Sequence, residues 1–313
     1  MKWYASLMKN LKYKGEIGFQ LDCFLDWLYN RYVRFGGTKK AINRRFFKVH
    51  GYDVNWNDPQ TLNEKIQWLK VYGYEPFHTI CADKYRMREY LKEKFKNNDY
   101  QIPVLYITDN WRDINMDVLP DIPFVIKANH TQGDVLIVRK KEDIDIKKLR
   151  IDCRWWLRRN LYPISCEPQY KDITPLIMVE KLLLNREGRL PNDYKLHYFN
   201  SKLQFVYCSI DREGINKRNI YDADWNPLPF TWSEPYKDSS TLRGPEIPPP
   251  SSFETMKKLA SEIAKDFKYV RVDFYDVDGA LYFGEITLHH GSGLDVFSPK
   301  EYDLIYGKKL MLK

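Results

Sequence analysis

Apolar residues recur at helical spacing in several parts of the chain, and each recurrence predicts a helix with one buried face. One such pattern runs from Thr61 to Lys96. Another begins at Ser251 and Glu254, which form an S-x-x-E capping box. The apolar face of that second helix is Phe253, Met256, Leu259, Ile263 and Phe267. From Ser298 onward the sequence predicts a loop and a short closing helix.

The first fifty residues mix aromatic and basic side chains. The apolar residues near helical spacing here are Phe19, Cys23, Phe24, Trp27, Leu28 and Tyr32. We expect this stripe to pack against a core. The alternative is a basic amphipathic helix on an anionic membrane surface, which would make the chain a peripheral protein of the inner membrane face.

Short apolar runs bounded by Pro, Asp or Gly predict strands in the rest of the chain. Single strands are expected at residues 102–107, 124–127 and 176–182. Two pairs of runs are typical of antiparallel hairpins, residues 194–199 with 203–210 across Asn200-Ser201-Lys202, and residues 270–275 with 280–288. Helices combined with antiparallel hairpins indicate an α+β fold.

Composition narrows the class of protein. Hydrophobic residues make up 43% and aromatic residues 15% of the 313, which is typical of a globular chain. The net charge of +8 favours an acidic partner such as a nucleotide, a phospholipid or a polyanionic glycan. The basic residues gather early, in residues 9–14 and 39–45, where a plain solvated surface explains them equally well. No RNP, zinc-finger or helix-turn-helix pattern is present, so no nucleic-acid partner is expected.

Five cysteines are an odd number and include no CxxC pair. We therefore expect reduced thiols and a cytoplasmic location. No uninterrupted apolar run near the N-terminus is long enough for a signal peptide or a membrane span.

The second hairpin carries the most informative polar residues. Arg271 and Asp273 share one face of its first strand, and Glu285 and Thr287 share one face of the next. A three-residue loop, Asp278-Gly279-Ala280, would place Asp273 opposite Glu285 with Cβ atoms about 5 Å apart. A two-residue loop would send the carboxylates to opposite faces. Facing carboxylates and their hard oxygens suit Mg²⁺, so a metal site and an edge hairpin with exposed acids both remain open here.

Two other segments suit nucleotide binding. Lys127 ends an apolar strand and precedes a polar loop, residues 128–134, whose amide groups and lysine charge suit phosphate. Glu180-Lys181 follows an apolar strand in the manner of a hinge that binds an adenine amino group. Each segment also fits an ordinary strand end with a solvated or paired charge.

The order of these elements resembles the ATP-grasp superfamily. That order is Lys84, Lys127 with its loop, Val179-Glu180-Lys181, Asp193-Tyr194-Lys195, Arg271-x-Asp273 and Glu285-x-Thr287. Four motifs between about residues 50 and 300 narrow the resemblance to the TupA-like group, named for teichuronopeptide biosynthesis. They are Leu62-Asn63-Glu64-Lys65-Ile66-Gln67-Trp68, Ala82-Asp83-Lys84-Tyr85-x-x-Arg88, Glu167-Pro168-Gln169-Tyr170 and Phe283-Gly284-Glu285-Ile286-Thr287.

The resemblance implies an ATP-grasp fold, in which two α+β lobes with antiparallel sheets sandwich the nucleotide. The implied segments are a helical basic N-terminal region at 1–60, the N-terminal part of the core at 61–120, a small lobe with the phosphate loop at 121–180, and a C-terminal lobe with the metal hairpin at 181–313. The implied cofactors are ATP and Mg²⁺.

It also implies roles for individual residues. The residues implied to contact the ATP phosphates are Lys84 and Lys127, under a loop around Thr131, Gln132 and Gly133. Those implied for adenine are Val179, Glu180, Lys181 and Leu182, with Asp193 and Lys195 on the ribose and phosphate side. The implied Mg²⁺ ligands are Asp273, Glu285 and Thr287, and Arg271 would stabilise the transferring phosphoryl group. His289 and His290 would line the acceptor site as proton acceptors, or form a structural loop.

Two positions depart from the family pattern. Many ATP-grasp enzymes have Asn where this chain has Thr287, a weaker oxygen donor. The expected phosphate loop is also poorer in glycine than in many members. Either departure would fit an altered metal geometry or a site that has lost turnover.

By this resemblance we expect an ATP-dependent ligase that joins a uronic-acid sugar of a capsular or cell-wall polysaccharide to an amino acid or small amine through an acyl phosphate. Two alternatives stay open. One is a glycosyltransferase of polysaccharide biosynthesis, and the other is a glycan-binding or membrane-binding adaptor with a degenerate nucleotide site.

Overall fold

A computed structural model describes residues 11–96, 100–214, 216–234 and 243–313. The basic residues Lys2 and Lys9 and part of the proline-rich loop before residue 250 lie outside the described residues. The chain divides into two compact units. Unit 1 extends to Ala41 and adds Pro103–Leu182, and unit 2 comprises Ile42–Ile102 and Leu183–Lys313. Residues 42–102 thus group with the C-terminal part of the chain.

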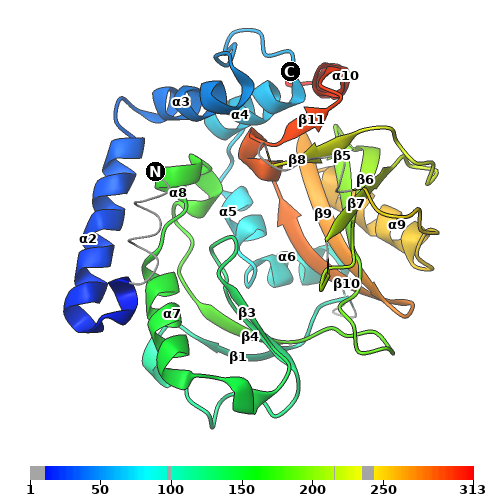
Figure 1. The fold of residues 1–313 in the computed structure, drawn as a ribbon. Coiled ribbons are helices and arrows are strands. Elements are labelled where there is room, and N and C mark those ends of the chain that lie inside the picture. The colour runs from blue at the N-terminus through cyan, green and yellow to red at the C-terminus, as the bar shows by residue number, and fades with distance from the viewer. Residues whose placement is uncertain (1–10, 97–99, 215, 235–242) are drawn as a thin grey trace. The chain divides into compact units, whose positions relative to one another are not determined.

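Unit 1 is built on a four-stranded antiparallel sheet in the order β1-β4-β2-β3 (Figure 1). Its strands are β1 Val104–Thr108, β2 Phe124–Ala128, β3 Val135–Val138 and β4 Ile177–Lys181. The helix α7, Ile146–Arg158, packs its buried residues Leu149, Cys153 and Trp156 with the apolar side chains of β2 and β4. The rest of the unit includes α2 Gly15–Val33, the first residues of α3 Thr38–His50, and α8 Tyr162–Ser165.

Unit 2 is built on a five-stranded antiparallel sheet in the order β10-β9-β5-β6-β7 (Figure 1). Its strands are β5 Asp193–Phe199, β6 Lys202–Ile210, β7 Lys217–Tyr221, β9 Tyr269–Val277 and β10 Ala280–Thr287. One face of this sheet packs on α9, Phe253–Ala264, around Leu196, Val270 and Val272. The other face begins as an aromatic core around Phe205, Tyr269 and Trp232 and continues as the polar surface described below.

Further helices of unit 2 are α4 Leu62–Tyr72, α5 Phe77–Ala82, α6 Met87–Phe95 and α10 Glu301–Lys309, and a small sheet pairs β8 Thr231–Ser233 with β11 Val296–Ser298. The helical pattern predicted from Thr61 to Lys96 is therefore three helices. The first ends at Gly73, and the third begins after a turn in which Asp83 accepts hydrogen bonds from the amides of Tyr85 and Arg86. The expected strands and the closing helix are present.

The capping box predicted before α9 was wrong. Ser251 and Glu254 do not form a capping box, because the residue before α9 is Ser252 and its hydroxyl donates to Asp276 at 2.5 Å. The capping box lies instead at Thr61 and Glu64, before α4. The apolar face predicted for α9 is buried as expected, with every one of its members no more than 8% exposed.

The aromatic stripe of α2 does not pack as expected. Phe19 is buried, but Phe24, Trp27, Leu28 and Tyr32 are 54%, 51%, 42% and 76% exposed. The predicted core packing of this stripe is therefore wrong for most of its members. Among the described residues, no helix is long and apolar enough to cross a membrane. All five cysteines are free thiols.

Candidate functional site

Polar side chains replace apolar ones partway along the central strands of unit 2. Lys195 and His197 of β5 lie directly opposite Asp273 and Arg271 of β9 in the ladder. Because side chains alternate along a strand, these residues share one face, while Val270, Val272 and Phe274 point to the core beneath α9. The sequence predicted this alternation correctly.

The loop of the β9–β10 hairpin is shorter than the register prediction required. Val277 pairs with Ala280, so the loop is the two residues Asp278-Gly279, both with the positive φ angles of a tight hairpin turn. This is the two-residue alternative, which by itself would send Asp273 and Glu285 to opposite faces. A β-bulge restores the predicted outcome, because Gly284 and Glu285 together stand opposite Asp273.

Gly284 is required for this bulge. A Cβ on it would lie 3.2 Å from the carbonyl oxygen of Asp273 and 3.3 Å from the Asp273 Cβ. With the extra residue inserted, Glu285 returns to the face that carries Asp273. The two carboxylates therefore meet on one face, although not by the loop that the sequence suggested.

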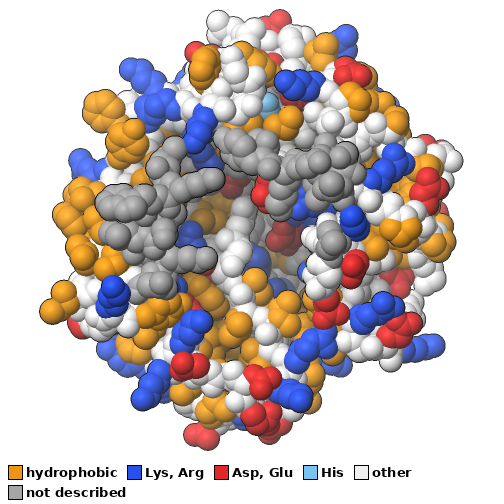
Figure 2. Space-filling view, viewed as in Figure 1, with side chains coloured by type: hydrophobic (Ala, Val, Ile, Leu, Met, Phe, Trp, Pro, Cys, Tyr) orange, Lys and Arg blue, Asp and Glu red, His pale blue; other side chains and the backbone are white. Residues whose placement is uncertain are grey.

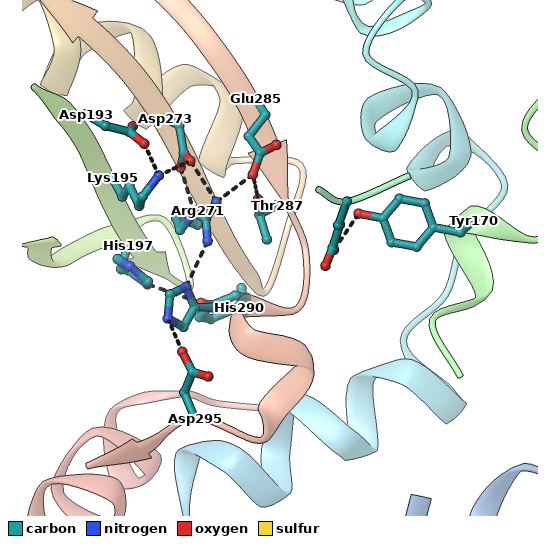
Figure 3. A network of polar contacts seen from close by, with 12 residues as sticks. Tyr170, Asp193, Lys195, His197, Arg271, Asp273, Glu285, Thr287, His290 and Asp295 are labelled. Atoms are coloured by element: carbon teal, nitrogen blue, oxygen red, sulfur yellow. Dashed lines mark hydrogen bonds and ion pairs between the residues drawn. The ribbon is translucent and has the colours of Figure 1, made fainter. Parts of the chain in front are cut away.

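The guanidinium of Arg271 lies between the two carboxylates (Figure 3). It donates to both oxygens of Asp273 at 2.7 Å each and to Glu285 Oε1 at 2.6 Å. Its remaining amino group is 2.9 Å from Nδ1 of His290. Arg271 is 8% exposed, so these charge-assisted hydrogen bonds act away from bulk water, where they are strong.

Lys195 is the second cation of this cluster. It donates to Asp273 Oδ2 at 2.9 Å and is paired with Asp193. Three carboxylates and two cations leave the group of Asp193, Lys195, Arg271, Asp273 and Glu285 with one excess negative charge. Lys84, whose charge also acts on Glu285, brings the balance of the site close to neutral.

Glu285 is held ionised. Burial by itself raises its pKa, but the charges of Arg271, Lys84 and Lys195 and the hydrogen bond donated by Thr287 at 2.9 Å hold the pKa at about 2. For Asp273, burial outweighs the two cations and raises the pKa above its ordinary value. Lys84, expected at the phosphates, is thus close enough to act on Glu285 electrostatically.

The donor set suits Mg²⁺. Asp273, Glu285 and Thr287 supply hard oxygens on one face of the hairpin. Among the described residues, no group of three or more His, Cys, Asp or Glu side chains is arranged to hold a metal ion. Mg²⁺ in nucleotide sites is usually bound by one or two protein carboxylates and keeps several waters, with substrate phosphate oxygens among its other ligands.

His290 lies behind Arg271. Its Nδ1 accepts the Arg271 hydrogen bond, because a guanidinium only donates, and its Nε2 faces the carboxylate of Asp295 at 3.2 Å. Burial lowers the pKa of His290, against the effect of Asp295. This geometry favours a positioning role for a neutral His290 rather than the proton acceptor that the sequence suggested.

His289 points elsewhere. It lines a cleft of about 530 Å³ within unit 2, together with Trp68, Tyr72, His78 and Lys268. Burial lowers the pKa of His289 well below its ordinary value, so it is neutral at pH 7. The side chains of the two adjacent histidines therefore lie in different surroundings, His290 beside Arg271 and His289 in the cleft.

Three polar residues of α4, to which the sequence alone assigned no role, hold the segment after β10. Asn63, Gln67 and Lys70 of α4 are 0%, 1% and 4% exposed. Asn63 donates to the carbonyl of Asp295, Gln67 to those of Ser292 and Gly293, and Lys70 to Ser292. Their spacing of four and three residues puts them on one helix face, and this spacing was the only sign of their role in the sequence. Buried polar residues at this spacing fix the position of His290 and Asp295.

His50 also contacts this segment, through the backbone of Gly293, and burial lowers its pKa to about 4. An unfolded histidine titrates near 6.5. As the pH falls from about 6.5 to 4, the unfolded chain gains this proton first, so the folded state loses stability. Between pH 6.5 and pH 4, we expect the free energy of unfolding of the wild type to fall by about 2 kcal/mol more than that of His50→Gln. Urea denaturation at pH 7 and pH 4.5 measures this, and identical pH dependence in both proteins would contradict it.

In unit 1 the structure brings Lys127 and Glu180 together. Lys127 Nζ lies 2.5 Å from Glu180 Oε2, across the β2–β4 ladder. The sequence assigned these residues to the phosphates and to adenine respectively, and the ion pair links the two. The amides of Lys181 and Leu182 donate to the carbonyls of Pro103 and Pro123, so these two amides already have acceptors within the protein.

The expected phosphate loop is a tight connection between β2 and β3. Ala128 N donates to the carbonyl of Asp134, which closes the loop. Asn129 fixes its start by accepting from Leu176 N at 2.7 Å and donating to Thr174 O at 3.0 Å. Thr131 is buried at 2% exposure. Gln132 and Gly133 are exposed at the tip, and Gln132 donates to the hydroxyl of Tyr170 (Figure 3).

The chain is similar to several solved structures. The D-alanine–D-alanine ligase from Bacillus anthracis complexed with ATP matches 67% of this chain and 54% of its own, at 18% identity and a TM-score of 0.40. An L-amino acid ligase from Bacillus licheniformis matches 86% of this chain and 58% of its own, at 12% identity and a TM-score of 0.42. The ATP-grasp ligase PsnB, in complex with a phosphomimetic variant of its minimal precursor, Mg and ADP, matches 73% of this chain and 58% of its own, at 10% identity and a TM-score of 0.40. The chain thus spans little more than half the length of these proteins.

No curated protein sequence matches the chain. A family profile does, the one described as TupA-like ATPgrasp, and it matches residues 64–311. That match spans most of the chain and includes the β9–β10 hairpin with its acids and Arg271. The chain therefore belongs to the TupA-like ATP-grasp family.

Proposed function

We propose that this protein is an ATP- and Mg²⁺-dependent carboxylate–amine ligase, which forms an amide and releases ADP and phosphate. The observation that carries the proposal is the buried cluster in which Arg271 lies between Asp273 and Glu285. Its hard carboxylate oxygens, which lie beside the cations Arg271, Lys195 and Lys84, suit a metal-bound triphosphate.

In this proposal the residues of unit 2 act on the phosphate end of ATP. Asp273, Glu285 and Thr287 hold Mg²⁺, which when bound neutralises phosphate charge. Arg271 stabilises the charge of the transferring phosphoryl group, and Lys195 and Lys84 supply further positive charge nearby. In unit 1, Lys127 and the loop around Gln132 and Gly133 bind phosphate and Glu180 binds adenine.

The reaction has two steps. A carboxylate oxygen of the acceptor attacks the γ-phosphorus of ATP. The bond between the γ-phosphorus and the bridging oxygen breaks, and ADP leaves with that oxygen and the electron pair of the bond. The nitrogen of the amine then attacks the carbonyl carbon of the acyl phosphate, phosphate leaves, and the amine loses a proton. The chain's role in both steps is to position reactants and stabilise charge, which is how phosphoryl-transfer enzymes work.

We propose a uronic-acid sugar of a cell-surface polysaccharide as the carboxylate, with an amino acid or small amine as its partner. The family name and the net charge of +8 support an acidic glycan.

A panel of uronic acids and amines tests the proposal. We expect ADP and phosphate to be released in amounts equal to the amide, detected by mass spectrometry, only when acid, amine and Mg-ATP are all present. Turnover of a nucleotide sugar without ATP would identify a glycosyltransferase instead. If Mg-ATP leaves the melting temperature unchanged, the chain is an adaptor with a degenerate site, because a bound nucleotide stabilises the native state.

A further inference from the structure

The helix α2 of unit 1 presents an apolar face to the outside. Ile17, Leu21, Phe24 and Leu28 follow one another at intervals of four, three and four residues, which places them on one side of the helix. Their side chains are 85%, 45%, 54% and 42% exposed. We call these four residues the α2 apolar face.

The side of α2 that packs on the protein is the more polar one. Its buried residues are Gly18, Phe19 and Asp22. Phe19 contacts the ring of Trp155 edge-on and the guanidinium of Arg154 at 3.9 Å. Asp22 is 3% exposed although it carries a carboxylate. A surface helix ordinarily turns its apolar side inward, and this helix has the opposite orientation.

Positive charge accompanies the α2 apolar face. Residues 11–41 contain six Lys and Arg and three acids. Asp22 is turned inward, and both oxygens of Glu16 accept hydrogen bonds from Arg154 at 2.6 and 2.8 Å. Arg31, Lys39 and Lys40 are exposed. The charge that this region offers to a partner is therefore basic, and Figure 2 shows orange and blue side chains along the edge where Figure 1 draws α2.

Aromatic residues lie at the C-terminal end of the same helix. Trp27, Tyr32 and Phe35 are 51%, 76% and 79% exposed, and the Arg31 guanidinium lies 5.2 Å from the Trp27 ring centre. Aromatic rings with basic side chains beside them are the composition that settles at the headgroup level of a bilayer.

We propose that α2 docks this protein onto an anionic lipid bilayer, with the α2 apolar face entering the boundary between headgroups and acyl chains. The helix lies in the plane of the surface, since no described helix is able to cross a membrane. Arg31, Lys39 and Lys40 contact the acidic headgroups and add electrostatic attraction to the burial of the apolar face.

Sedimentation of the whole protein with lipid vesicles tests this proposal without any nucleotide, so its result is independent of the proposed function. We expect binding to vesicles that contain phosphatidylglycerol and roughly tenfold weaker binding to pure phosphatidylcholine, because the basic residues lose their partners. Leu21→Ser with Leu28→Ser should weaken binding to the acidic vesicles by about tenfold or more, since two leucines then no longer bury apolar area in the lipid.

The matched control is Leu304→Ser with Ile305→Ser on α10. These residues are 40% and 42% exposed, close to the 45% and 42% of Leu21 and Leu28. We expect this control to bind acidic vesicles within about twofold of the wild type. Equal binding by the α2 variant and the wild type would overturn the proposal, as would equal binding to neutral and acidic vesicles. A wild-type dimer that the α2 variant converts to a monomer, with no vesicle binding by either, would identify the face as a contact between two copies instead.

Discussion

Asp273→Asn is expected to lower the rate of ATP turnover by about a thousandfold, which corresponds to roughly 4 kcal/mol of transition-state stabilisation. Asparagine keeps the shape of the side chain and one oxygen for Arg271, but it removes the anionic oxygen that a hard cation prefers. It also removes one negative charge from the cluster. The measurement is ADP release at saturating acid, amine and Mg-ATP.

Glu285→Gln is the companion variant. Its side chain is 37% exposed, so its loss disturbs the core less than that of Asp273, which is 3% exposed. The matched control is Glu254→Gln, an exposed glutamate of α9 that pairs with Lys257, and we expect its turnover to equal that of the wild type. Circular dichroism and thermal unfolding of each variant separate lost turnover from lost folding. Wild-type turnover in both Asp273→Asn and Glu285→Gln would exclude these residues as metal ligands.

Arg271→Leu is expected to destabilise the folded protein by about 3 kcal/mol, because the buried Asp273 keeps only Lys195 as a cation partner and the partly exposed Glu285 loses the cation beside it. It also removes the donor to His290. Leucine fills part of the space, so the loss arises mainly from the uncompensated carboxylates rather than from a cavity. Urea denaturation measures the free energy of unfolding.

Arg186→Leu provides the comparison for this second variant. Its side chain is 87% exposed and reaches Asp278 only at 4.0 Å, so we expect a change within about 0.5 kcal/mol. Adding Mg²⁺ should restore more stability to Arg271→Leu than to the wild type, because a cation then replaces the missing charge between the acids. A loss below about 1 kcal/mol in Arg271→Leu would mean that the acids are not held as a charged pair.

The β9–β10 hairpin separates what was predictable from what was not. The alternation of residues identified Arg271, Asp273, Glu285 and Thr287 and put the first two on a common face. The loop length was open between two and three residues; the structure has two, and a bulge at Gly284 returns Glu285 to the face of Asp273. A bulge depends on how closely the neighbouring strand approaches, which local sequence does not specify.

The helix α2 shows the same limit in another form. Periodicity located its stripe of apolar residues, but a periodic pattern is the same whether the stripe faces a core or the outside. The inward positions of Phe19 and Asp22 decided the question, and they depend on the contact with α7. Likewise, the spacing of the polar residues of α4 is visible in the sequence. Their role is not, because their partners lie in the segment 290–295, more than two hundred residues away in sequence.

The sequence by itself determined the α+β class, most of the strands, the family and the set of polar residues, because these follow from local periodicity and from the order of short motifs. Only the tertiary structure decided that Arg271 lies between Asp273 and Glu285, that His290 supports Arg271, and that Lys127 pairs with Glu180. Each of these contacts joins strands or loops that meet only in the folded chain. Their geometry is set by sheet register and burial, which no local stretch of sequence contains.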